Sequence, residues 1–126
     1  MIASVYMVPA FADDIAPYSS TMIETYQASL SISGSYLQVY MYAQAHNTMG
    51  TLGVSTFYVQ KKSGSTWTTV YSGINGYYSY NTSSFVSNLS SCAYSSNSTY
   101  RVCANFYAKN GSRSESKYYI SDSIQT

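Results

Sequence analysis

An alternating run near the C-terminus, Tyr100 to Lys109, constrains the fold of this chain more than any other stretch. Its small and apolar side chains share one side of an extended backbone: Tyr100, Val102, Ala104, Phe106 and Ala108. The intervening residues share the other side: Arg101, Cys103, Asn105, Tyr107 and Lys109. This two-residue period predicts a half-buried β-strand. The turn signal Asn110-Gly111-Ser112 follows directly, so we expect a hairpin and a further strand.

Similar runs recur along the chain, and turn signals separate them at intervals of about 8–12 residues. We expect strands at about 21–32, 36–45, 54–62, 66–71, 84–90, 100–109 and 115–123. Residues 46–53 contain two glycines and are expected to form a loop, whereas residues 77–80 fit either an edge strand or an aromatic loop. The expected core anchors outside the opening run include Phe57, Val59, Trp67, Val70, Phe85, Leu89, Tyr118 and Ile120. The sequence therefore predicts an all-β fold, a two-sheet antiparallel β-sandwich of about seven strands or a small barrel.

Composition supports this fold and disfavours some partners. Charged residues make up 9% of the chain, against about 25% in an average soluble domain. Hydroxyl groups take their place, with 25 Ser, 11 Thr and 16 Tyr. A net charge of +1 and six scattered Lys and Arg do not form the basic stripe that nucleic acid binding requires. No apolar run approaches the ~20 residues of a membrane span.

The first twelve residues are apolar and uncharged, and they end in Ala10-Phe11-Ala12. Small residues at −3 and −1 are what signal peptidase recognises, so we predict a signal-peptide remnant over 1–12 with cleavage after Ala12. Residues 13–20 are expected to form a flexible N-terminus and 21–126 a single β-sandwich domain. The alternative for residues 1–12 is a buried first strand. The favoured interpretation places the protein outside the cell, as a secreted chain.

The two cysteines, Cys92 and Cys103, are predicted to form a disulfide in this exported protein. The loop between them is short, and an unstrained bridge of this size would stabilise the fold by about 3 kcal/mol. The alternative is two free thiols, because strand geometry can direct the two Cβ atoms apart.

The order of these runs resembles the immunoglobulin-like and fibronectin type III sandwich superfamily, in which Tyr100 would occupy the tyrosine corner. More narrowly, residues 36–120 resemble small secreted bacterial proteins of uncharacterised function. The motifs that carry this second resemblance are Thr48-Met49-Gly50, Gln60-Lys61-Lys62, Ser63 to Trp67 and Phe106 to Lys109. The cysteine pair departs from that pattern. Because these motifs are structural, the resemblance implies a fold rather than an activity.

No constellation for catalysis or metal binding is recognisable. The single histidine, His46, lies in a predicted loop, and no Gly-x-Ser-x-Gly elbow occurs. One His, two Cys and five acids, mostly isolated, do not form a zinc-ligand pattern. We therefore expect a protein that is not an enzyme and needs no cofactor.

Tyrosine carries the functional hypothesis. Three tyrosines are expected on the outer face of one sheet: Tyr36, Tyr40 and Tyr42. The other sheet is expected to display Tyr58, Gln60, Arg101, Asn105 and Tyr107, together with Tyr119. Exposed tyrosine beside amide groups is typical of binding surfaces, whereas high strand propensity alone would also place tyrosine there. We predict a module that binds a glycan or a surface protein. The alternative is a structural protein that self-associates through its uncharged strands.

Overall fold

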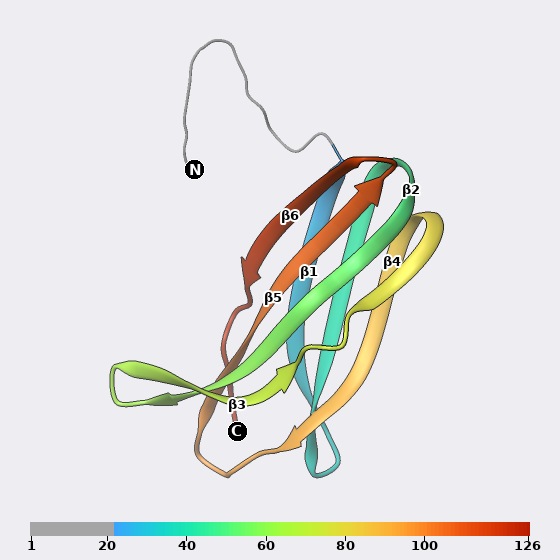
Figure 1. The fold of residues 1–126 in the computed structure, drawn as a ribbon. Coiled ribbons are helices and arrows are strands. Elements are labelled where there is room, and N and C mark those ends of the chain that lie inside the picture. The colour runs from blue at the N-terminus through green and yellow to red at the C-terminus, as the bar shows by residue number, and fades with distance from the viewer. Residues whose placement is uncertain (1–21) are drawn as a thin grey trace.

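The structure is a computed structural model and describes residues 22–126. Figure 1 shows an all-β fold with antiparallel strands. The seven strands are β1 (Ile23–Ser33), β2 (Tyr36–Ser63), β3 (Thr66–Gly73), β4 (Tyr77–Ala93), β5 (Thr99–Asn110), β6 (Arg113–Ile120) and β7 (Ile124–Gln125). Among the described residues no helix is long and apolar enough to cross a membrane. The predicted fold class is therefore confirmed at the level of an all-β, antiparallel fold with seven strands.

Strand β2 holds the sheet together, because its 28 residues pair with four other strands. Its first half, up to Ala45, pairs with β1 on one side and with the second half of β4 on the other. Its second half pairs with β5 on one side, and with β3 and the beginning of β4 on the other. Register shifts interrupt these ladders between Gln44 and Met49 and between Val54 and Thr56. Such irregularities bend and twist a strand without ending it.

The predicted loop at 46–53 is wrong, because these residues continue β2. Its two glycines signalled a loop, but in the structure they lie inside a bent strand. A Cβ atom on Gly53 would collide with the backbone carbonyl oxygen of Tyr77 and lie 2.9 Å from the Cα of Tyr78. Glycine here allows β4 to approach β2 closely, which is one of the reasons glycine occurs within strands.

All seven strands belong to one hydrogen-bonded sheet that curls over its own core. The ring of Tyr26 on β1 lies 5.5 Å from the ring of Phe106 on β5 and 6.0 Å from that of Tyr119 on β6, centroid to centroid. Strand β1 therefore packs across the core from β5 and β6. The largest fully buried side chains between these layers include Phe57, Phe106, Ile23, Leu37, Met41 and Leu52.

The alternation predicted for Tyr100 to Lys109 is confirmed in β5. The five inward positions are all buried, and the turn at Gly111, with φ at 66°, joins β5 to β6. The hydroxyl of Tyr100 accepts a hydrogen bond from the backbone N–H of Ser95, five residues upstream, at 2.9 Å. This bond ties the buried side chain at the beginning of β5 to the backbone of the segment that precedes the strand.

The predicted orientation of β6 is wrong. Tyr118 and Ile120 are 56% and 48% exposed, while Tyr119 packs against the core. The register is the physical reason, because Tyr118 lies opposite Asn105 and Ile120 opposite Cys103, both on the outward row of β5. Two charged residues on the inward row, Lys117 and Glu115, obscure this pattern in the sequence. The Glu115 carboxylate accepts hydrogen bonds from the backbone N–H groups of Met22 and Ile23 at 3.2 and 2.9 Å.

Strand β3 also differs from expectation in its anchor residue. Val70 is 42% exposed, because the β2–β3 ladder shifts register where it lies. Tyr71 takes the inward position instead and stacks on Phe57, with ring centroids 5.9 Å apart. Trp67 is half-buried and lies on the outer side of the sheet, where the β2–β3 hairpin extends away from the other strands (Figure 1).

Candidate functional site

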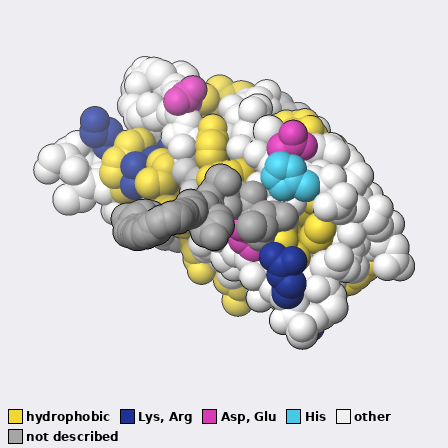
Figure 2. All heavy atoms as spheres, turned by 90° about the horizontal axis from the view of Figure 1, so that it is seen from above, with side chains coloured by type: hydrophobic (Ala, Val, Ile, Leu, Met, Phe, Trp, Pro, Cys, Tyr) yellow, Lys and Arg dark blue, Asp and Glu magenta, His cyan; other side chains and the backbone are white. Residues whose placement is uncertain are grey.

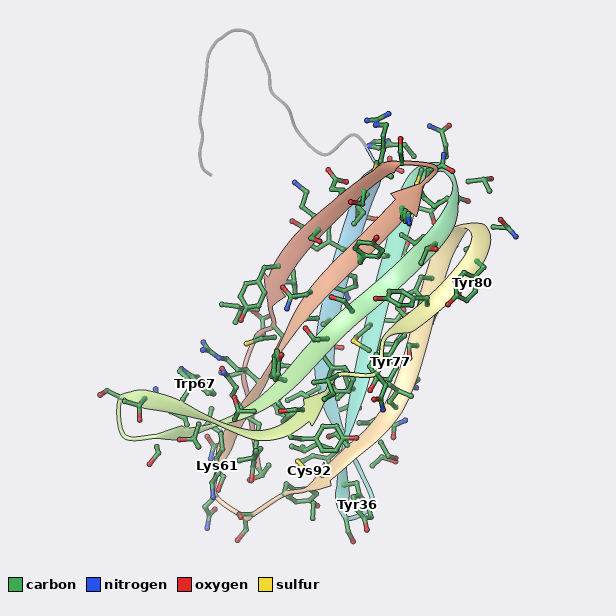
Figure 3. All side chains as sticks on the ribbon, in the orientation of Figure 1. Tyr36, Lys61, Trp67, Tyr77, Tyr80 and Cys92 are labelled. Carbon is green, nitrogen blue, oxygen red and sulfur yellow. The ribbon has the colours of Figure 1, made fainter. Side chains whose placement is uncertain are left out.

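The outer side of β5 and its neighbours carries a continuous set of aromatic and amide side chains. Register pairing places Gln60 opposite Arg101, Tyr58 opposite Cys103, Thr56 opposite Asn105 and Gly53 opposite Tyr107. We call this surface the aromatic face and define it by six rings: Tyr58, Trp67, Tyr78, Tyr80, Tyr107 and Tyr118. These rings come from five strands, β2 to β6. Trp67 and Tyr80 mark its two ends (Figure 3).

At the β4 end the rings contact one another. Tyr78 and Tyr107 lie opposite each other across Gly53, and their ring centroids are 5.9 Å apart. Tyr78 also contacts Tyr80 at 6.5 Å, and Tyr80 is 65% exposed. Because Gly53 has no side chain, the rings on either side of it can meet. Burial, and then the nearby phenols of Tyr107 and Tyr80, raises the pKa of Tyr78, so its hydroxyl stays protonated and can donate a hydrogen bond.

At the opposite end, a cation is held against an indole ring. The guanidinium carbon of Arg101 lies 4.2 Å from the centroid of the Trp67 ring, a favourable cation–π distance. The Nε of Arg101 donates a hydrogen bond to Oε1 of Gln60 at 2.9 Å. Gln60 in turn accepts from the thiol of Cys103 at 3.4 Å and donates to Thr69 at 3.4 Å. The guanidinium is therefore held on two sides by the protein.

Between these ends, the face combines rings with fixed amides. The side-chain amide of Asn105 donates to the hydroxyl of Thr56 at 2.9 Å. A hydrogen bond with Cys103, and then burial, raises the pKa of Tyr118. Such a surface offers flat apolar area interrupted by hydrogen-bonding groups.

The eight predicted binding residues divide between two faces. The structure brings together Tyr58, Gln60, Arg101, Asn105 and Tyr107 on the aromatic face. The remaining three, Tyr36, Tyr40 and Tyr42, lie on the outward row of the first half of β2. There Tyr40 lies between Ser29 and Asn88, and Tyr42 between Gln27 and Val86. On this second outer face the three tyrosines lie among mainly polar residues. Whether either face binds a ligand remains a prediction.

The predicted disulfide is wrong, because Cys92 and Cys103 are both free. Their positions explain this. Cys92, near the end of β4, packs against the hydrophobic core, whereas Cys103 points outward from β5 and bonds to Gln60. Cys103 is only 1% exposed, since the side chains of the aromatic face cover it. The two thiols thus lie on opposite sides of the sheet, as the alternative interpretation allowed.

Sequence reasoning missed four members of the aromatic face: Trp67, Tyr78, Tyr80 and Tyr118. A signal existed for Tyr78 and Tyr80, whose spacing of two residues puts them on the same side of a strand. Residues 77–80 indeed begin β4. Predicting that they lie beside Tyr107 would have required the strand order, which local sequence does not determine.

His46 lies in β2 rather than in the expected loop and is exposed. Its backbone N–H donates to the carbonyl oxygen of Met22 at 3.0 Å. Within residues 22–126, no three His, Cys, Asp or Glu side chains come together as a metal site would require. The predicted signal-peptide remnant, cleavage site and flexible segment lie in residues 1–20, outside the described part of the chain.

Charge is sparse and unevenly placed. Figure 2 shows few charged side chains, lying among uncharged ones, on the end of the molecule seen there. The described acids are Glu24 on β1, Glu115 on the inward row of β6 and Asp122 between β6 and β7. The outward rows of the aromatic face carry cations instead: Lys62, Arg101 and Lys109. This face is therefore weakly positive.

Comparison with known proteins gives no indication of what this site does. No protein-family model, curated protein or solved structure matches this chain.

Proposed function

We propose that the protein is a secreted, non-enzymatic module that binds carbohydrate through its aromatic face. The observation that carries this proposal is the row of contacting rings formed by Tyr80, Tyr78 and Tyr107 on the outer side of the sheet. The faces of pyranose rings are lined by C–H groups, which pack well on aromatic rings. The hydroxyl groups of a sugar need hydrogen-bond partners, and Gln60, Asn105 and the phenol groups supply them.

A second feature supports carbohydrate over a folded protein partner. Protein interfaces gain most of their energy from side chains inserted into desolvated pockets. The aromatic face instead presents rings along the outer rows of five strands, with Tyr80 and Tyr118 mostly exposed. An extended sugar chain can follow such a row and contact several rings in turn.

The finer fold assignment belongs to this proposal. We infer that the curled sheet is a two-sheet sandwich of the immunoglobulin or fibronectin type III kind. Three features support this inference: the tyrosine-corner bond of Tyr100, the packing of β1 across β5 and β6, and the hairpin at Gly111.

The test is a binding measurement with matched double variants. The purified chain is screened against soluble and immobilised polysaccharides, and each hit is quantified by isothermal titration calorimetry. Tyr78→Ala with Tyr107→Ala should weaken binding at least tenfold, which corresponds to about 1.4 kcal/mol. The control variant, Tyr40→Ala with Tyr42→Ala, also removes two tyrosine side chains, but from the second outer face, and should leave affinity unchanged.

Circular dichroism and thermal unfolding establish that both variants remain folded. The proposal is rejected if no polysaccharide binds the folded protein, or if binding is lost in the Tyr40/Tyr42 variant and retained in the Tyr78/Tyr107 variant.

A second candidate function, self-association, is favoured by the edges of the sheet. Within residues 22–126, β1 and the second half of β4 each pair with β2 alone. Glu24 is the one charged residue in these two edge segments. Natural proteins usually protect such edges with charge, proline or bulges.

Light scattering over a hundredfold range of concentration tests this candidate. Self-association predicts a mass that rises with concentration and falls back to the monomer value when Val86→Lys places a charge on the edge of β4. A constant monomer mass in the wild-type chain would exclude it.

A further inference from the structure

The Trp67 end of the aromatic face carries a cation that is fixed in place before any ligand arrives. Arg101 is held at 4.2 Å from the Trp67 ring centroid, and its Nε is bonded to Gln60 at 2.9 Å. These contacts use one face of the guanidinium and one of its N–H groups. Its two terminal NH₂ groups have no hydrogen-bond partner within residues 22–126. A guanidinium held in this way loses little side-chain entropy when a ligand binds.

The positive charge of Arg101 is also unbalanced. Arg101 forms no ion pair within residues 22–126. This holds although an acid, Asp122, directly follows Ser121, which is hydrogen-bonded to the neighbouring residue Val102. Lys62 adds a second positive charge, because it lies opposite Trp67 in the β2–β3 ladder. Lys61, by contrast, donates to the hydroxyl of Ser95 at 3.4 Å. The Trp67 end is therefore a locally cationic patch beside a row of rings.

The chemistry of this pair indicates which group it fits. The planar fork of a guanidinium matches a carboxylate, with which it forms two parallel hydrogen bonds. A stacking surface lies close by, because Tyr58 is two residues from Gln60 on the same outward row of β2, roughly 7 Å along the strand. A pyranose ring stacked on Tyr58 would therefore place a carboxylate attached to that ring near Arg101.

We propose that Arg101, seated on Trp67 and held by Gln60, binds the carboxylate of an acidic sugar while the neighbouring rings bind the sugar ring itself. This inference rests on the proposed carbohydrate-binding function and specifies its ligand as a glycan that carries a carboxylate. Uronic acid chains and sialylated oligosaccharides share this chemistry. In this assignment Gln60 is a positioning residue, because it acts through Arg101.

The experiment compares pairs of probes that differ in the carboxylate. Hexagalacturonate is paired with its fully methyl-esterified form, and sialyllactose is paired with lactose. Calorimetry on the full chain should show at least one acidic probe binding tenfold or more tightly than its neutral partner. This preference should shrink as salt rises from 50 to 500 mM, because the recognition is electrostatic.

Variants then assign the preference to Arg101. Arg101→Gln should reduce affinity for the acidic probe at least tenfold and leave affinity for the neutral probe within twofold. Arg101→Lys should give an intermediate loss, because it keeps the charge and loses the planar fork. Lys109→Gln removes the same charge from the same outward row of β5, far from Trp67, and serves as the matched control.

The possible outcomes separate this inference from the proposed function. Equal binding of acidic and neutral probes, or an acidic preference that survives Arg101→Gln, overturns the role of Arg101 and leaves carbohydrate binding in place. If the folded wild-type chain binds none of these probes, the role of Arg101 is overturned, and the polysaccharide screen alone decides the proposed function. If Arg101→Gln lowers the unfolding temperature, the salt dependence of the wild-type chain and the Arg101→Lys variant still decide the question.

Discussion

At Gly53, both the fold and the aromatic face depend on the absence of a Cβ atom. A methyl group on this residue would collide with the carbonyl oxygen of Tyr77 and approach the Cα of Tyr78 at 2.9 Å. Both obstacles are backbone atoms, so the conflict cannot be relieved by rotating a side chain. Gly53→Ala must therefore move β4 away from β2 where the Gly53–Tyr78 pair is formed.

The cost can be worked out from this geometry. Overpacking a rigid site costs about 1–3 kcal/mol, and we expect the upper end because two backbone segments must separate. Gly50 offers a matched control on the same strand, since a Cβ there meets only the carbonyl oxygen of Lys109, at 3.4 Å. Gly50→Ala should change stability by no more than about 1 kcal/mol, with the reduced freedom of the unfolded chain favouring the variant.

Urea unfolding followed by tryptophan fluorescence and circular dichroism measures both variants. A loss of about 3 kcal/mol would lower the melting temperature of a domain of this size by roughly 10 °C. Gly53→Ala should also weaken carbohydrate binding, because the rings of Tyr78 and Tyr107 meet across this residue. Equal stability of the Gly53 and Gly50 variants would refute the close approach of β4 to β2.

Three further predictions follow from individual contacts. Without reductant, the denatured chain should titrate two thiols, and in the folded chain Cys92 should react with a thiol reagent much faster than Cys103, which is 1% exposed; a disulfide-linked chain would titrate none. Tyr100→Phe leaves the N–H of Ser95 without its partner and should cost about 1–2 kcal/mol in urea unfolding, whereas an unchanged midpoint would show that the bond contributes nothing. Burial raises the pKa of Tyr78 above its ordinary value of 10.0, so the folded state holds this proton more tightly than the unfolded chain. The free energy of unfolding should therefore fall as pH rises past about 10, and the fall should be shallower in Tyr78→Phe; parallel pH profiles would contradict this.

The local sequence pattern predicted a strand and its orientation correctly where inward apolar and outward polar residues alternate without interruption. Strand β5 shows this, because its inward residues are uniformly small or apolar and its outward ones polar. The orientation of β6 was predicted wrongly, since its inward row holds two charged residues, Lys117 and, near its beginning, Glu115. The hydrogen bonds of Glu115 to the backbone of Met22 and Ile23 compensate for its inward position. Those partners lie over ninety residues away in sequence, so no local signal indicates them.

The candidate site shows the same limit. Alternation showed which side of its strand each of the eight predicted binding residues occupies, and five of the eight do share one face. The alternation did not show that Tyr78 and Tyr80 join them, because this depends on β4 pairing with the second half of β2. The disulfide prediction failed for a related reason. Spacing in sequence made a bridge between Cys92 and Cys103 plausible, but the direction of each side chain depends on the strand that carries it.

The position of the free edges bears on how binding and self-association would combine. The weakly protected edges belong to β1 and the second half of β4, which flank the first half of β2. The aromatic face lies on the second half of β2 and on the segments around it, namely β3, the beginning of β4, β5 and β6. Pairing of chains through those edges would leave the aromatic face open on every copy. A polysaccharide repeats its binding unit, so several faces could engage one chain at once, and each further contact would become intramolecular. In that arrangement weak stacking on each copy is sufficient for firm attachment, because the affinity of the assembly exceeds that of a single face.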